Sequence, residues 1–160
     1  MSERYLCVHG HFYQPPRDDP FTCTVPREAG AEPYHDFNEK INAECYRPNA
    51  EEGNFRYINF DLGPTLAEWL ECNDPRTYSL ILAADRYNVE RYGVGNAMAQ
   101  SYNHTILPLA TTRDKRIQIA WGIADFRRRF RRDPEGMWIS ETAVDYETLS
   151  IMAEMGIKFT

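Results

Sequence analysis

The sequence predicts an α/β fold in which parallel strands alternate with helices, as in a barrel or an open sheet. Short apolar stretches recur along the 160 residues and are separated by segments with helical spacing, which is typical of parallel sheets. Polar residues follow several of these stretches, so we expect a site at one rim of the sheet. Because a complete barrel takes roughly 250 residues, the chain is expected to supply about half to two-thirds of one.

The first strand is expected at residues 5–8, where four apolar, strand-forming residues lead into a polar segment. Residues two apart on a strand share a face, so His9 and His11 would project together if the strand continues that far. Together with Gln14 they are interpreted as part of a site at the strand end. The alternative is that each histidine has only a structural role.

Residues 15–56 form a long excursion that contains six of the ten prolines. Long loops at strand ends are usually functional. Within the excursion, Asp36 is placed to cap a helix in which Phe37, Ile41 and Cys45 make one apolar face. We therefore expect a lid or rim that packs over the first strand.

The middle of the chain predicts a second strand, two helices and a third strand. They are expected at residues 57–62, from 64 through 70, from 75 to about 92, and at 96–102. Pro64 suits the first turn of its helix, and Gly93 and Gly95 end the next one. His104 follows the third strand, at the same kind of place as His9 and His11.

A further helix is expected from Thr111 or Thr112 through Phe130, and five arginines lie between residues 127 and 132. Arginines at the end of a helix complement its dipole. No second basic cluster accompanies them, and the net charge of the chain is −6. We therefore expect a solvated helix end and no nucleic-acid partner.

Glu141 lies where a strand passes into a helix. A short apolar strand is expected at residues 136–139, and Thr142 and Asp145 have the spacing of a helix start, with Thr142 as the cap. Because ligands bind at the carboxyl ends of parallel strands, Glu141 is a candidate catalytic group. The alternative is a glutamate that only helps to cap the helix.

The end of the chain predicts a helix from about residue 146 to 154 and then the opening of another strand at 156–160. A natural chain rarely stops at such a point. We therefore expect a fragment of a longer protein.

The composition excludes several other classes of protein. The chain is 42% hydrophobic and 26% charged, as in ordinary globular domains. It contains neither a run of about 18 apolar residues nor a signal peptide, so no membrane association is predicted and a cytoplasmic location is expected. The four cysteines are widely spaced, which predicts reduced thiols, no metal and no cofactor.

Three segments together resemble glycoside hydrolase family 57. They are residues 9–16 (HGHFYQPP), 101–109 (SYNHTILPL), and 121–126 (WGIADF) through 136–145 (GMWISETAVD). The resemblance implies a partial (β/α)7 barrel, truncated after about the fourth or fifth strand, with residues 1–160 as the N-terminal portion of one barrel domain. It also implies retaining chemistry on α-glucans such as starch or glycogen, since the family includes α-amylases, 4-α-glucanotransferases and glycogen branching enzymes.

The resemblance also assigns roles to residues. It implies that Glu141 is the nucleophile, that His104 belongs to the second motif, and that Trp138 is the aromatic residue before the nucleophile. It implies substrate binding by Gln14 and by His11 or His9. Two departures from the family pattern are Ser140, where Pro is common, and Arg131, where Gly is expected.

Retaining glycosidases need a second carboxyl group about 5–5.5 Å from the nucleophile to protonate the leaving oxygen. In the family this group is an Asp on a later strand, which would lie beyond Thr160. The chain by itself is therefore expected to lack its general acid and to be inactive.

Two alternative functions stay open. His9, His11 and His104, with Glu141, could be ligands of a metal-dependent hydrolase. A non-catalytic barrel that only binds glucan is the other alternative. For both the glucan-acting enzyme and the glucan-binding barrel, the expected partner is an α-glucan oligo- or polysaccharide. An incomplete barrel is also expected to self-associate through its exposed edges.

Overall fold

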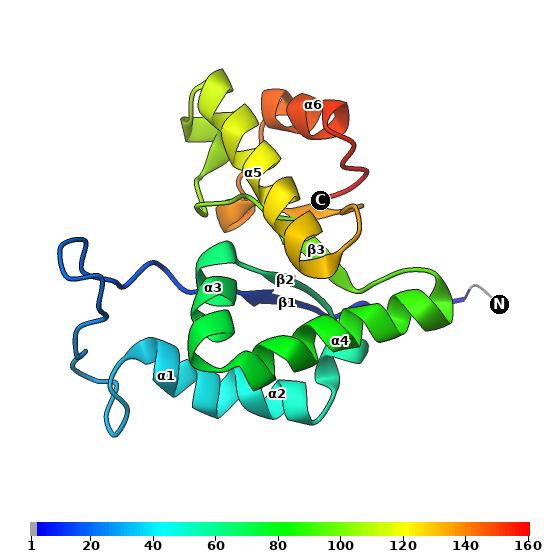
Figure 1. Cartoon of the computed structure of the whole chain (residues 1–160). Helices are drawn as coiled ribbons and strands as arrows, with labels where there is room; N and C mark the ends of the chain where they lie inside the picture. The colour runs from blue at the N-terminus through cyan, green and yellow to red at the C-terminus, as the bar shows by residue number, and fades with distance from the viewer. Residues whose placement is uncertain (1–2) are drawn as a thin grey trace.

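The computed structural model describes residues 3–160, so the first two residues of the predicted domain lie outside the described part. Four parallel strands form one sheet in the order of the sequence, which confirms the α/β prediction (Figure 1). The strands are β1 (His9–Phe12), β2 (Asn59–Leu62), β3 (Ala97–Gln100) and β4 (Met137–Trp138). Parallel strands in sequential order are the arrangement of a (β/α) barrel segment.

The helices lie on the outer side of the sheet and in the excursion before β2 (Figure 1). They are α1 (Phe37–Ile41), a π-helical stretch (Asn42–Tyr46), α2 (Arg47–Glu51), α3 (Pro64–Asn73), α4 (Pro75–Tyr92), α5 (Thr112–Phe130) and α6 (Tyr146–Glu154). Single 3-10 turns occupy Asn54–Arg56, Leu107–Leu109 and Ser140–Thr142. The predicted bounds of α4, α5 and α6 are confirmed. None of the helices within residues 3–160 combines the length and the apolar character needed to span a bilayer.

The two faces of the sheet differ in character. The outward side chains of Phe60, Ala97, Ala99 and Met137 are buried in the hydrophobic core beneath the helices. Helix α5 approaches β3 so closely that a Cβ on Gly122 would lie 2.0 Å from a β3 carbonyl oxygen. The core therefore lies between sheet and helices, and the opposite, inner face carries the polar side chains.

The first strand was predicted four residues too early. Tyr5 and Leu6 are about 90% exposed and lie outside any strand, whereas β1 begins at His9. The register pairs His9 with Asn59 and His11 with Asp61. The strand therefore lies where its polar residues pair with β2 and Phe12 enters the core, and the exposed apolar run before it stays outside.

The predicted cap of α6 was also wrong. Asp145, and not Thr142, caps the helix by accepting a hydrogen bond of 2.7 Å from the Thr148 backbone N–H. Lys115 from α5 donates to the same carboxylate at 2.7 Å. Because Asp145 is held in this way, the helix starts at Tyr146, and residues 140–142 form a separate turn.

The later part of the excursion at residues 15–56 packs against the outer face of β1. Asp36 caps α1 as predicted, with its carboxylate accepting from the Glu39 N–H. The rings of Tyr46 and Phe55 lie 5.8 Å and 4.9 Å from that of Phe12 in β1. The lid role of this segment stays a prediction.

The arginine-rich end of α5 is held by ion pairs within the fold. Arg129 is buried and bonds to Asp125 and Glu71. Arg132 bonds to the buried carboxylate of Asp85. These two side chains are therefore structural, and the prediction of a solvated helix end is wrong for the buried Arg129.

The end of the chain begins a further parallel pairing. Phe159 forms a bridge with Gly136, and the Lys158 N–H donates to the Glu135 carbonyl at 2.8 Å. This confirms the predicted opening of a strand. All four cysteines have free thiols.

Candidate active site

Asp61 in β2 connects two of the predicted site histidines. Its carboxylate is fully buried, with one oxygen 3.0 Å from His9 Nε2 and the other 2.7 Å from His11 Nδ1. A buried carboxylate is retained only when such partners satisfy it. Asp61 thus fixes the orientation of both imidazoles on the inner face of the sheet.

His104 follows β3 and meets His11. Its Nε2 lies 3.2 Å from Nε2 of His11. Because the Nδ1 of His11 faces a carboxylate, we assign that nitrogen the proton, so the Nε2 of His11 accepts from His104. Burial, followed by the proximity of His11, lowers the pKa of His104 below 6.5, although Glu141 and Asp61 oppose this shift. His104 is therefore neutral at pH 7.

Aromatic rings stack against both histidines. Trp138 of β4 lies over His11 with ring centroids 3.7 Å apart and an interplanar angle of 17°. Tyr13 lies over His104 at 3.8 Å and 24°. Rings with one free face beside hydrogen-bonding groups can hold a flat apolar face of a ligand.

Glu141 follows β4 and is presented to solvent. Its side chain is 66% exposed, and its carboxylate lies 4.0 Å from His104 Nδ1. The backbone has φ 55° at Glu141, 52° at Thr142 and 56° at His104, in the left-handed region that non-glycine residues rarely adopt. Such strain persists where the surroundings enforce it and clusters at active sites.

A buried hydrogen bond ties the ends of β3 and β4 together. The hydroxyls of Ser101 and Ser140, both fully buried, lie 2.8 Å apart. Ser101 lies three residues before His104, and Ser140 directly precedes Glu141. Ser140, one of the two departures from the family pattern noted in the sequence, therefore has a defined partner.

The structure brings five predicted site residues together: His9, His11, His104, Trp138 and Glu141. Gln14 is buried instead, where its amide nitrogen donates to the Tyr46 hydroxyl at 2.7 Å and its amide oxygen accepts from Arg17 at 2.9 Å. Substrate binding by Gln14 stays a prediction.

The geometry does not assemble a metal site from the predicted ligands. Within residues 3–160 no three side chains of His, Cys, Asp or Glu are grouped as metal ligands would be. His9 and His11 each use one nitrogen on the Asp61 carboxylate.

Sequence reasoning missed Asp61. The signal was a single acidic residue within an otherwise strand-forming stretch, between Phe60 and Leu62. Its importance depends on the register with His11, which the sequence alone does not give.

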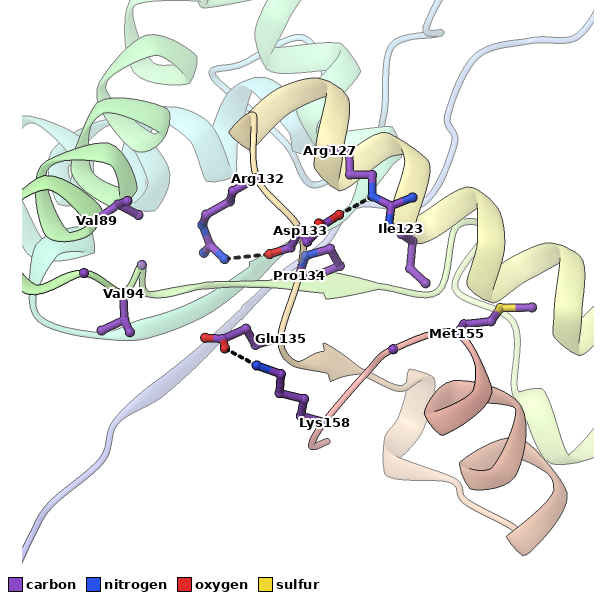
Figure 2. A pocket seen from close by; sticks show the side chains of 13 residues that line it. Val89, Val94, Ile123, Arg127, Arg132, Asp133, Pro134, Glu135, Met155 and Lys158 are labelled. Carbon is purple, nitrogen blue, oxygen red and sulfur yellow. Dashed lines mark hydrogen bonds and ion pairs between the residues drawn. The ribbon is translucent and has the colours of Figure 1, made fainter.

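A cavity of about 570 Å³ lies at the other, amino end of the strands (Figure 2). Its charged lining residues are paired, Arg127 with Asp133 and Glu135 with Lys158. His104 and Glu141 follow the carboxyl ends of β3 and β4, and none of the predicted site residues lines this cavity, so the candidate site does not coincide with it.

In a comparison with models of protein families, residues 5–160 match the model of glycosyl hydrolase family 57. No curated protein matches the sequence. Two solved structures are similar: a 4-α-glucanotransferase from Thermococcus litoralis, with TM-score 0.68 and 22% identity, and a GH57 branching enzyme from Thermococcus kodakaraensis, with TM-score 0.63 and 18% identity.

The first alignment covers 94% of this chain and 21% of the other, and the second covers 96% and 38%. The chain thus spans well under half of either structure, and at these identities the likeness concerns the fold, a partial barrel. The family model matches nearly all of the chain. This protein therefore belongs to glycosyl hydrolase family 57.

Proposed function

We propose that this chain is part of a retaining glycoside hydrolase or glucanotransferase that acts on α-glucans, with Glu141 as the nucleophile. Family membership supports the reaction class, and the two similar structures support the substrate class. The observation that carries the proposal is the exposed Glu141 carboxylate at the end of β4, 4.0 Å from His104.

The reaction would proceed in two displacements. The Glu141 carboxylate attacks the anomeric carbon while the glycosidic bond breaks and an acid protonates the leaving oxygen. Water then releases the sugar in hydrolysis, or the hydroxyl of another glucan releases it in transfer. An exposed carboxylate on a strained backbone suits the first step, because it is accessible and held in place.

The neighbouring side chains would bind and orient the sugar. Neutral His104 through its Nδ1, and His9 through the nitrogen that Asp61 does not engage, offer hydrogen bonds to hydroxyl groups, which strengthen as positive charge develops on the sugar ring. Trp138 or Tyr13 would stack on a sugar face.

We further propose that the general acid lies outside residues 3–160. Asp61 is the acidic residue closest to the histidines, but it is fully buried and both of its oxygens accept from imidazoles. It therefore cannot deliver a proton to a leaving oxygen. The family members of similar structure have much longer chains that could supply the acid.

Fluoride release from α-maltosyl fluoride tests the nucleophile without the acid, because fluoride leaves without being protonated. We expect the chain to release fluoride above the buffer rate and Glu141→Gln to reduce release to that rate. The matched control is Glu135→Gln, which removes a carboxylate paired with Lys158 at the opposite end of β4 (Figure 2). Undiminished release by Glu141→Gln would contradict the proposal.

A further inference from the structure

Gln100, the last residue of β3, carries a buried amide that nothing in the described chain satisfies. The residue is only 3% exposed, and within residues 3–160 neither Oε1 nor Nε2 has a hydrogen-bond partner. Buried amide groups are nearly always paired, so a wholly unpaired one calls for an explanation.

The amide lies on the face of the sheet that carries the candidate active site. Side chains alternate along a strand, and Ala97 and Ala99 are buried in the core on the outer face. Gln100 therefore projects to the inner face, and the parallel register places it beside Trp138. Trp138 in turn stacks on His11.

Gly63, which follows β2, borders the same space. A Cβ on Gly63 would lie 3.0 Å from the Gln100 amide oxygen and 2.9 Å from Cδ2 of the Tyr13 ring. The φ of Gly63 is −60°, which any residue adopts, so glycine is not needed here for backbone conformation. Its lack of a side chain lets the Gln100 amide and the Tyr13 ring approach the backbone at this position.

We propose that Gln100 is a further substrate-binding residue, whose amide hydrogen-bonds to hydroxyl groups of the α-glucan. This inference rests on the proposed function. An amide donates through its nitrogen and accepts through its oxygen, which matches two neighbouring sugar hydroxyls that each do both. In the structure the Tyr13 ring, stacked on His104, lies beside the amide next to Gly63. A sugar that reaches the amide would have to displace the Tyr13 side chain.

Calorimetric titration with maltoheptaose tests the assignment on this chain and on Gln100→Met, which keeps the length of the side chain and removes the amide. We expect Kd to rise about tenfold, as for the loss of two hydrogen bonds. We expect the Tm to stay the same or rise, because the amide has no partner in the unliganded fold.

Thr148→Val is the matched control. The Thr148 hydroxyl is likewise buried and unpaired among the described residues, but it lies in α6 outside the candidate site. Its loss should leave Kd unchanged.

The outcomes separate the two proposals. If the unaltered chain binds maltoheptaose and Gln100→Met binds equally well, the inference about Gln100 is overturned and the proposed function stands. A markedly lower Tm for Gln100→Met would assign the amide a structural role and overturn the inference. No saturable binding by the unaltered chain would overturn both.

Discussion

Trp138 and His11 stack with their ring centroids 3.7 Å apart, although they come from the two outermost strands, β4 and β1. Neighbouring strands are about 4.8 Å apart, so two strands separated by two others would be about 14 Å apart in a flat sheet. The contact therefore requires a curved sheet with a concave inner face. That curvature gathers side chains from four strand ends into one site.

We predict that Asp61→Asn weakens both the fold and the site. The substitution removes the charge that holds His9 and His11, so the free energy of unfolding should fall by about 1–3 kcal/mol. Fluoride release should fall as well, because both imidazoles lose their orientation. Denaturant titration and the fluoride assay measure the two effects.

Asp85→Asn is the control for this experiment. Asp85 is also buried and bonds to Arg132 and to the Ala97 N–H, at the amino end of β3. We expect Asp85→Asn to lose a similar amount of stability. Under conditions in which this variant stays folded, its fluoride release should be unchanged. Equal loss of release in both variants would show that Asp61 acts only on stability.

His104 should titrate below pH 6.5, because burial and His11 both lower its pKa. Since Glu141 raises that pKa, Glu141→Gln should lower it further, and His11→Gln should raise it by removing the neighbouring imidazole that lowers it. Imidazole resonances followed by NMR against pH report each value. An unchanged His104 pKa in both variants would argue against this cluster.

Asp74 should make the fold sensitive to acid. Although burial opposes ionisation, hydrogen bonds from Asn42, Thr77 and Arg47 lower the pKa of Asp74 to about 2 from 3.8 in the unfolded chain. A carboxylate with a lowered pKa stabilises the fold above pH 4, and this contribution is lost as the pH falls from about 4 to 2.

The measurement is the free energy of unfolding as a function of pH. In Asp74→Asn the decline between pH 4 and pH 2 should be shallower than in the unaltered chain. Asp145, whose pKa Lys115 and Thr148 also lower to about 2, should still contribute to the decline. Identical slopes would contradict the assignment to Asp74.

Thr142→Gly tests whether backbone strain positions Glu141. Relief of the left-handed strain at φ 52° should exceed the entropic cost of glycine and raise the free energy of unfolding by about 0.5–1 kcal/mol. Fluoride release should nevertheless fall, because the turn no longer constrains Glu141. Arg131→Gly, which relieves similar strain at φ 57° at the end of α5, should stabilise the chain without affecting release.

The sequence predicts the helices well because their ends are encoded locally. Asp74 caps α4, Gly93 ends it with φ 76°, and Thr111 caps α5 through the Asp114 N–H. These signals act within four residues of the helix end. Where two acidic or hydroxyl residues compete, as Thr142 and Asp145 do, a distant partner such as Lys115 decides the cap.

The site could be predicted only in part. His9, His11, His104, Trp138 and Glu141 stand at recognisable strand ends in the sequence. Asp61 and Gln100 could not be found in this way, because one depends on strand register and the other on lacking a partner in the fold. Both properties belong to the assembled sheet.

The identity of the nucleophile is tested most directly by mass spectrometry after reaction with a maltosyl fluoride that carries a second fluorine on the reacting sugar. The extra fluorine slows release of the covalent glycosyl–enzyme, so that intermediate accumulates. We predict that the peptide containing Glu141 gains the mass of one maltosyl group that still carries the second fluorine, and that Glu141→Gln gains none. A label on another carboxylate, or fluoride release without any label, would contradict the account.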